Sequence, residues 1–257
     1  MNRGKNRREF LSGAIAAGFA MSSFASAPVA PTRRKLLKRS QVNATVKIAK
    51  RVFADLGMRL PPFAFMTPAD WERVGHEYDE IRDCNLGWDV TDFGMEDFAH
   101  YGRCLFMLRN GKNNAAYPKP YAEKFILDPE GQCAPEHFHK VKREDIINRG
   151  GGTLVFELYN RRGKTAELAD TPVTLARDGE LVTVGPGEKL RLEPGESITL
   201  EPNVFHAFYA AEGADVMIGE VSSVNDDLAD NVFFVPQLRF PVIEEDEAPY
   251  HLLVGDY

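Results

Sequence analysis

The stretch GQCAPEHFHKVKREDIINRGG, residues 131–151, contains the pattern on which the fold assignment depends. His137 and His139 are two residues apart, so on a β-strand both imidazole rings leave the same face. Glu144 follows five residues after His139, and the glycines at 150–152 permit a tight reversal into another strand. On such a returning strand the carboxylate can approach the two rings, which predicts a metal-binding type of cluster on a β-scaffold.

A third histidine, His206, follows a later predicted strand and would complete this cluster. Three neutral imidazoles and one carboxylate suit a borderline first-row metal ion, with coordination positions left for water or substrate. The sequence therefore predicts a divalent metal ion held by His137, His139, Glu144 and His206. Cys133 shares the strand face of His137 by parity, but we expect a small buried thiol there rather than a zinc ligand.

The spacing of these residues resembles the first motif of the cupin superfamily. The residues at its fixed positions are Gly131, His137, His139, Glu144 and Gly151. The second motif is degraded: Gly195, Pro202 and His206 keep their order, but the usual glycine between Pro202 and His206 is missing. The resemblance implies a mainly β protein with a single cupin (jelly-roll) β-barrel. The alternative is a strand that carries two ordinary surface histidines.

The rest of the sequence fits a mainly β domain preceded by helices that pack on one side of it. Helical spacing of apolar residues from Ser40, as N-cap, to Gly57 predicts one helix. Thr67 and Pro68 predict the start of a second helix, whose apolar face reaches Ile81. Short apolar segments separated by turns, after about residue 90, are typical of a sandwich or small barrel. The expected strands are Cys104–Arg109, Phe125–Leu127, Thr153–Tyr159, Val173–Ala176, Leu181–Val184, Lys189–Leu192, Ser197–Leu200, Ala207–Tyr209 and Val216–Val221.

The first 27 residues have the composition of an export signal. The sequence NRREFLS at 6–12 precedes a short Ala- and Gly-rich apolar run, and ASA at 25–27 is a small-x-small cleavage pattern. The paired arginines resemble a twin-arginine signal, which predicts a periplasmic or exported protein. The alternatives are an amphipathic first helix or an uncleaved anchor. We expect a linker over 28–39 and a cupin domain over 40–257, with a helical extension at 40–90.

Charge and cysteine content exclude several classes of function. The net charge is −7, and no long Lys/Arg block follows residue 40. This argues against nucleic acid and anionic membrane surfaces as partners, and we expect no stable membrane insertion after signal cleavage. The chain has three cysteines and no CxxC motif, so we expect free thiols rather than a disulfide framework. A small soluble molecule is the expected partner.

Six further stretches resemble the D-lyxose isomerase family, and the likeness covers roughly residues 40–257. They are LGWDVTDFG at 86–94, YPKPYAEK at 117–124, EDIINRGGG at 144–152, ADTPVT at 169–174, GEVSSVNDDLADN at 219–231 and IEEDEAP at 243–249. The resemblance implies an aldose–ketose isomerase that uses Mn²⁺, with Co²⁺, Fe²⁺ or Zn²⁺ as alternatives. It would interconvert D-lyxose with D-xylulose, and D-mannose with D-fructose. The export signal departs from the family, whose members are usually cytoplasmic.

Moving a carbonyl from C1 to C2 of a sugar requires a proton shuttle, for which a carboxylate near both carbons is suited. Glu220, on the predicted strand Val216–Val221, is the first candidate for this base, and a surface carboxylate in a salt bridge is the alternative. Lys124 is the candidate for contacting a substrate hydroxyl or the enediolate, unless it is a solvated lysine at a strand end. By resemblance, the residues that would hold sugar hydroxyls are Lys119, Asp227, Arg239 and Glu245.

Two other functions fit the same metal-binding pattern. One is another exported cupin metalloenzyme, such as an iron dioxygenase or a decarboxylase, although a bicupin decarboxylase needs a second HxH module and this chain has one. The other is a non-catalytic periplasmic cupin that binds sugar or metal. Oxygen consumption and ketose formation would distinguish these functions from isomerisation. Because cupin barrels often pair through sheet edges, we expect a homodimer.

Overall fold

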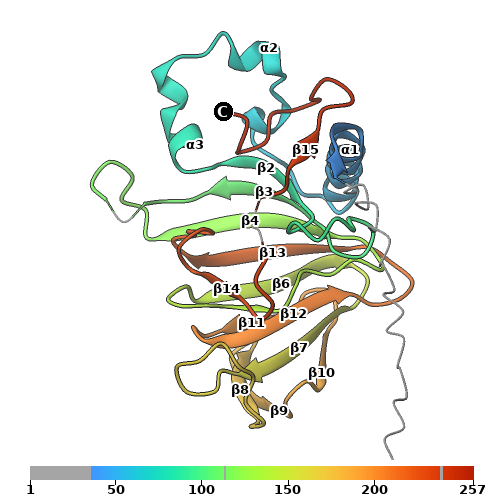
Figure 1. Ribbon diagram of the computed structural model, residues 1–257, viewed down its shortest axis with the longest axis vertical. Coiled ribbons are helices and arrows are strands. Elements are labelled where there is room, and N and C mark those ends of the chain that lie inside the picture. The colour runs from blue at the N-terminus through green and yellow to red at the C-terminus, as the bar shows by residue number, and fades with distance from the viewer. Residues whose placement is uncertain (1–35, 113, 238–239) are drawn as a thin grey trace, which may run out of the picture. The chain divides into compact units, whose positions relative to one another are not determined.

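The computed structural model describes residues 36–112, 114–237 and 240–257 (Figure 1). The predicted signal peptide at 1–27 and most of the predicted linker lie outside these residues, and so does Arg239. Within the described part of the chain, no helix is long and apolar enough to cross a membrane.

Two antiparallel β-sheets form the scaffold, and Figure 1 shows β2, β3, β4 and β13 of the larger sheet side by side. The larger sheet has the order β2 (Gly87–Thr91), β3 (Arg103–Arg109), β4 (Tyr121–Asp128), β13 (Val216–Ser223), β6 (Glu144–Gly151), β11 (Ser197–Leu200), β8 (Val173–Arg177) and β9 (Glu180–Val184). The smaller sheet has the order β10 (Lys189–Leu192), β7 (Leu154–Asn160), β12 (Val204–Ala210), β5 (His137–His139) and β14 (Asn231–Phe233). The two sheets are not closed into one barrel. Their arrangement nevertheless confirms the predicted mainly β, jelly-roll class.

The main hydrophobic core joins the two sheets. Ile126 of β4 and Ile218 of β13, from the larger sheet, belong to one buried cluster with Phe156 of β7 and Phe208 of β12, from the smaller. Side chains alternate between the faces of each strand, so the residues two positions along from core residues also point inward. Along β6, for example, Ile146 is fully buried, two residues after Glu144. This alternation brings polar side chains into the space between the sheets.

Helix α1 (Arg39–Asp55) covers the opposite face of the larger sheet. Its apolar residues, among them Val46 and Phe53, form a second buried cluster with Phe106 of β3 and Phe125 of β4. Burying each such side chain contributes roughly 1.5–3 kcal/mol. The prediction that the first helix packs on one side of the β-domain is therefore confirmed.

The predicted linker at 28–39 extends too far. Leu37–Lys38 forms β1, which pairs in parallel with β15 (Ile243–Glu244), and α1 begins at Arg39 rather than after Ser40. The cause is tertiary: the buried Arg39 guanidinium pairs with two carboxylates from the C-terminal segment. The backbone N–H and hydroxyl of Ser40 donate to Asp246 instead of capping the helix.

The second predicted helix is wrong beyond its first turn. Thr67 accepts a hydrogen bond from the Asp70 N–H as the expected cap, but α2 ends after Pro68–Trp71. Gly75 follows in a non-helical conformation, and glycine is a poor helix former. Short helical pieces complete this segment: η1 (Pro62–Phe65), η2 (His76–Tyr78) and α3 (Asp79–Asp83).

All the predicted strands occur, and the largest differences in their ends lie where polar residues interrupt the apolar pattern. Strand β4 begins at Tyr121, four residues before the predicted Phe125, and β12 begins at Val204 rather than Ala207. The added segments contain Lys124 and His206, both buried. These side chains are polar because they face a cavity between the sheets, and an apolar pattern does not identify such positions.

Glycines at the end of β6 produce the predicted reversal into β7. Gly150 and Gly151 have φ angles of 137° and 98°, a conformation that other residues rarely adopt. A Cβ atom at Gly151 would lie 2.0 Å from the Asp215 carbonyl oxygen. The sharp turn and this close backbone approach therefore both require glycine at 151.

A buried ion pair on the inner face of the larger sheet predicts a pH-dependent stability. Asp128 is fully buried and lies 3.2 Å from the Arg103 guanidinium. Burial raises the pKa of Asp128 from 3.8 to about 6, against the opposing effect of Arg103. Because the folded-state pKa is raised, the stabilisation from the bound proton is complete below about pH 4 and is lost as pH rises through about 6.

In the Asp128→Asn variant the side chain is a neutral amide at every pH, so this pH dependence disappears. The free energy of unfolding of the variant, relative to wild type, should therefore increase by ~2–3 kcal/mol between about pH 4 and pH 7. Urea denaturation at several pH values measures this difference. A difference that stays constant with pH would show that the Asp128 pKa is not raised.

Candidate active site

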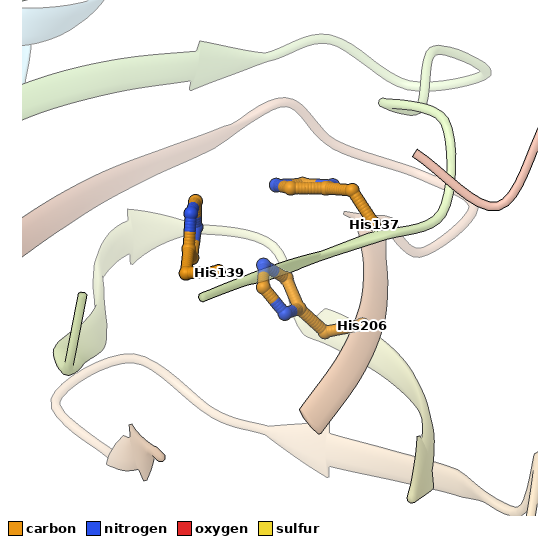
Figure 2. Close-up of side chains that lie close together, drawn as sticks. All are labelled: His137, His139 and His206. Carbon is orange, nitrogen blue, oxygen red and sulfur yellow. The ribbon is translucent and has the colours of Figure 1, made fainter. Parts of the chain in front are cut away.

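Three buried histidines converge from the smaller sheet, and Figure 2 shows their rings turned toward one another. His206 of β12 is the direct cross-strand partner of His137 of β5, and His139 lies two residues further along β5 on the same face. The ring centroids are 4.3 Å apart for His137 and His206, and 5.2 Å for His137 and His139. One ring nitrogen from each histidine lies within 4.8 Å of the others. This spacing suits a single shared metal ion.

Backbone carbonyls determine the proton positions on two of the rings. His137 Nδ1 lies 2.9 Å from the Pro135 oxygen, and His206 Nδ1 lies 3.1 Å from the Val204 oxygen. Because a carbonyl only accepts hydrogen bonds, each Nδ1 donates, which leaves the Nε2 lone pair of the neutral ring for a ligand. Burial, reinforced by His206 and His139, holds the pKa of His137 well below its ordinary value of 6.5. His137 is therefore in the neutral form that binds metals.

Glu144, the first residue of β6, adds an oxygen donor to this cluster. Its Oε1 lies 3.3 Å from His139 Nε2 and 3.2 Å from His206 Nε2. Burial alone would raise the pKa of Glu144, but Lys142 and His139 hold it well below its ordinary value, so the group is a carboxylate. The four residues predicted as metal ligands are thus brought together. Three imidazole nitrogens and one carboxylate oxygen fit a first-row divalent ion.

The loop before His206 shows how the degraded second motif still places this histidine. Asn203 has a φ angle of 68°, the left-handed conformation that the missing glycine would supply. Asparagine tolerates this conformation better than most residues. Its backbone N–H donates to the His139 carbonyl, and its side-chain oxygen accepts a hydrogen bond from Arg161. The second motif thus retains its turn although its glycine is absent.

Asp230 is a residue of the site that sequence reasoning missed. Its Oδ2 lies 3.4 Å from Nδ1 of His139, the ring nitrogen that faces away from Glu144. The same carboxylate accepts hydrogen bonds from the backbone N–H groups of Val141 and Lys142. Its only sequence signal was its position in the family-like stretch at 219–231. Carboxylates behind metal-binding histidines orient the ring and raise its basicity.

Asp230→Ala should therefore weaken metal binding without removing a ligand. The expected loss is about 10- to 100-fold in metal affinity, measured by titrating the metal-free protein with Mn²⁺ in competition with a chelating dye. The matched control is Asp97→Ala, because Asp97 makes a similar contact with the exposed His100. Equal affinities for both variants would rule out an orienting role for Asp230.

A chain of buried charges runs from the histidine cluster along the larger sheet. Lys142 Nζ lies 2.6 Å from Glu144 Oε2 and 2.9 Å from Glu220 Oε1, and Lys124 Nζ lies 2.9 Å from the same Glu220 oxygen. Asn225 Oδ1 accepts hydrogen bonds from both lysines. Sequence reasoning missed Lys142, because a lysine between two predicted strands is usually solvated. Here it joins the carboxylate beside the histidines to the predicted base.

Strand register brings Glu220 and Lys124 together. The two residues are direct cross-strand partners in β13 and β4, and both are buried. The alternative that Glu220 is a surface carboxylate is therefore wrong, and so is the alternative that Lys124 is solvated. Both side chains line a cavity with the three histidines, Glu144 and Lys142.

The predicted sugar-binding residues divide into three cases. Asp227 lines the cavity that contains the histidines. Lys119 and Glu245 do not: Lys119 pairs with Glu80, and Glu245, with 55% of its side chain exposed, pairs with Arg39 of α1. The partners of Lys119 and Glu245 are distant in the sequence, so the sequence did not predict these two ion pairs. Arg239 lies outside the described residues, so its predicted role stays a prediction.

The free thiols and the cavity wall complete the site. Cys84, Cys104 and Cys133 are all free, as predicted. Cys133 is not among the clustered ligand atoms, and burial raises its pKa, so it is a poor thiolate ligand. The aromatic walls of the cavity come from Phe93, Phe208 and Phe233.

A family model described as D-lyxose isomerase matches residues 37–257. The chain belongs to the D-lyxose isomerase family. Two curated members share its sequence over 224 residues, which is 86% of this chain and 98% of each relative. The D-lyxose/D-mannose isomerase of Serratia proteamaculans is 48% identical, and that of Escherichia coli O157:H7 is 45% identical. As a member of the D-lyxose isomerase family, the chain is a sugar isomerase.

Solved structures support the fold of this D-lyxose isomerase family member. Cellulomonas parahominis L-ribose isomerase with L-ribose has a TM-score of 0.55 at 15% identity, covering 82% of this chain and all of that one. A mutant of the Acinetobacter sp. DL28 L-ribose isomerase in complex with L-ribose has a TM-score of 0.56 at 13% identity, and the match covers 83% of this chain and all of that one. At these identities the likeness concerns the fold alone.

Proposed function

We propose that this protein is a metal-dependent isomerase that interconverts D-lyxose with D-xylulose and D-mannose with D-fructose through a cis-enediol intermediate. One observation carries the proposal: Glu220 and Lys124 lie in the same buried cavity as the three-histidine cluster. The names of the two curated relatives supply the sugars.

The proposed cofactor is Mn²⁺, with Co²⁺, Fe²⁺ and Zn²⁺ as alternatives, held by His137, His139, Glu144 and His206. A bound divalent ion supplies Lewis acidity, which stabilises negative charge as it develops on O1 and O2 of the sugar. The preference for Mn²⁺ comes from the family resemblance, because the donor set suits several first-row ions.

Glu220 is the proposed base. Both lysine contacts to Glu220 fall on Oε1, so Oε2 makes neither of them. In the aldose-to-ketose direction, Glu220 removes the proton from C2 and returns it to C1, while a proton moves from O2 to O1. The result is a carbonyl at C2 and a CH₂OH group at C1, so atoms and charge balance. General-base catalysis of this kind typically contributes ~10²–10⁴ in rate.

Lys124 and Lys142 have different proposed roles. Lys124 lies beside the base, where its ammonium can donate a hydrogen bond to a substrate oxygen as charge develops. Lys142 joins Glu144 to Glu220 and holds both carboxylates in place. Replacing one member of such a buried charge network leaves its partners uncompensated, which typically destabilises a protein by ~3–5 kcal/mol.

The test of the proposed function measures ketose formation. The protein is stripped with a chelator, reloaded with Mn²⁺, Co²⁺, Fe²⁺ or Zn²⁺ and incubated with D-lyxose or D-mannose. We expect D-xylulose and D-fructose, with no oxygen uptake at an oxygen electrode. Binding without ketose would support a carrier, and oxygen consumption would support a dioxygenase. Absence of ketose with every ion and both sugars would refute the proposal.

Export and homodimer formation are further proposals for this isomerase. The support for export is the sequence of residues 1–27, with paired arginines and a small-x-small site. Fractionation of expressing cells with mass spectrometry of the mature N-terminus tests it, and sedimentation equilibrium tests the homodimer.

A further inference from the structure

Two cavities lie next to each other on the inner face of the larger sheet. The inner chamber contains the histidine cluster, Lys124 and Glu220, and has a volume of about 40 Å³. The outer chamber, of about 310 Å³, is lined by Asp83, Met107, Val224 and Val254, among others. The outer chamber contains none of the proposed metal ligands and has no role in the proposed mechanism.

The two chambers are neighbours along strand β3. Its inward-facing residues are Arg103, Leu105 and Met107, in alternation. Arg103 lines the inner chamber, Met107 lines the outer chamber, and Leu105 lines both. Asp227 also lines both chambers. Leu105 and Asp227 therefore lie in the wall that the two chambers share.

The loop around Asn225 contacts residues of both chambers. Asn225 lines the outer chamber, yet its Oδ1 accepts hydrogen bonds from Lys124 and Lys142 of the inner chamber. Its backbone forms a reciprocal pair with the Asn110 side chain, with distances of 2.9 and 3.0 Å. A ligand in the outer chamber therefore lies against the same loop that binds both lysines.

The volumes decide how a sugar is accommodated. The inner chamber, at about 40 Å³, is only a few times the ~10–15 Å³ that a cavity needs to hold one water. A pentose or hexose is several times larger than one water, and small-molecule sites typically measure about 300–1,000 Å³. The outer chamber reaches this range. The reacting end of a sugar can enter the inner chamber only if the rest of the molecule lies elsewhere.

We infer that the outer chamber is the subsite for the tail of the open-chain sugar, from C4 onward, while C1 and C2 lie in the inner chamber. This assignment rests on the proposed isomerase function. It divides the substrate at Leu105 and Asp227. Pentoses and hexoses share the same inner contacts and differ in how far they extend into the outer chamber.

Charge identifies the class of tail that this subsite accepts. Among the described residues, Asp83 and Asp226 line the outer chamber with carboxylates and Lys112 lines it with an ammonium group. Asp89 and Asp227 also line it, and each already interacts with another group. Carboxylates accept hydrogen bonds from hydroxyl groups, but they repel a phosphate ester, which carries about −1.5 to −2 charges near neutral pH. The subsite therefore selects free sugars over sugars phosphorylated at the terminal carbon.

Filling the outer chamber tests the first part of this inference. Val224→Trp should lower kcat/KM for D-mannose roughly 10- to 200-fold, and the loss for the shorter D-lyxose should be smaller. Val221→Trp is the matched control, since Val221 precedes Val224 by three residues and lines neither chamber. Val254→Trp repeats the test from the C-terminal segment. Bound Mn²⁺ and thermal melting are measured for all three variants.

Comparing D-mannose with D-mannose 6-phosphate tests the second part. Wild type should prefer the free sugar by roughly 10²-fold or more in kcat/KM, and Asp83→Asn/Asp226→Asn should reduce this ratio by about tenfold. The control, Asp55→Asn/Asp97→Asn, removes the same charge elsewhere on the surface and should leave the ratio at the wild-type value. Equal use of both substrates by wild type would overturn the charge argument.

The outcomes separate this inference from the proposed function. If wild type produces ketose but Val224→Trp, Val254→Trp and Val221→Trp have the same kinetics, the subsite is wrong and the isomerase stands. If wild type produces no ketose, calorimetry with D-mannitol, the reduced sugar, still tests the chamber. Binding that is weaker in Val224→Trp than in Val221→Trp would support the subsite, and equal binding would refute it.

Discussion

His206→Ala should remove both the bound metal ion and the isomerase activity. His206 is buried and contributes one of three clustered imidazoles, with its Nε2 beside Glu144. Without this ring, the cluster retains two imidazoles and one carboxylate around a space left by the missing side chain. The loss of metal affinity should exceed the ~10- to 100-fold expected for a residue that only orients a ligand. Turnover should fall in parallel, because the proposed mechanism needs the ion to stabilise charge on O1 and O2.

Metal content per chain, measured by elemental analysis after gel filtration, checks this result. The control is His76→Ala, since the His76 side chain is fully exposed on η2 and pairs with Asp79. Circular dichroism and thermal melting of the metal-free proteins show whether His206→Ala still folds. A folded His206→Ala protein with a full complement of metal would remove His206 from the ligand set.

Glu220→Gln should retain the metal ion and lose catalysis. An amide has nearly the same shape as the carboxylate but cannot take up the proton from C2, so kcat should fall by ~10²–10⁴. Glu220 contacts Lys124 and Lys142 rather than the histidines, so the metal cluster keeps its donors. The expected pattern is a large decrease in kcat with little change in Mn²⁺ affinity.

Isotope exchange gives a second measurement for Glu220. In D₂O, a proton shuttle through an enediol lets solvent deuterium enter C1 of the ketose, and Glu220→Gln should slow this incorporation together with turnover. The matched control is Glu123→Gln on β4, which pairs with Arg109 and lines neither chamber. If Glu220→Gln kept kcat within a few-fold of wild type, a different group would be the base.

The fold class and the metal cluster could be predicted because local sequence determines them. An HxH pair on a strand presents both rings on one face whatever the rest of the chain does. The glycines at 150 and 151 permit the positive φ angles of the turn that returns the chain. For the same reason, the expected strands were all found, although some of their ends differ. The second predicted helix stops after Trp71, and Gly75, a weak helix former, follows four residues later.

Residues whose role depends on distant partners could not be predicted in the same way. Lys119 and Glu245 lie in family-like stretches, yet each pairs with a charged residue outside the cavity. Lys142 and Asp230 lie in equally ordinary sequence and are buried beside the proposed metal ligands and base. Both sets are charged residues in ordinary local sequence. Charge and spacing along the chain therefore do not distinguish a residue that pairs outside the cavity from one that is buried at the site.

The sequence by itself determined the β-scaffold, the family and the four residues proposed as metal ligands, because strand parity and turn glycines are local properties. Only the tertiary structure decided which charges face the interior. Glu220 meets Lys124 through the β13–β4 register. Lys142 contacts both Glu144 and Glu220, although Glu220 follows it by 78 residues in the sequence. Such contacts depend on how strands distant in the chain align, and a shift of one residue would turn each side chain to the opposite face.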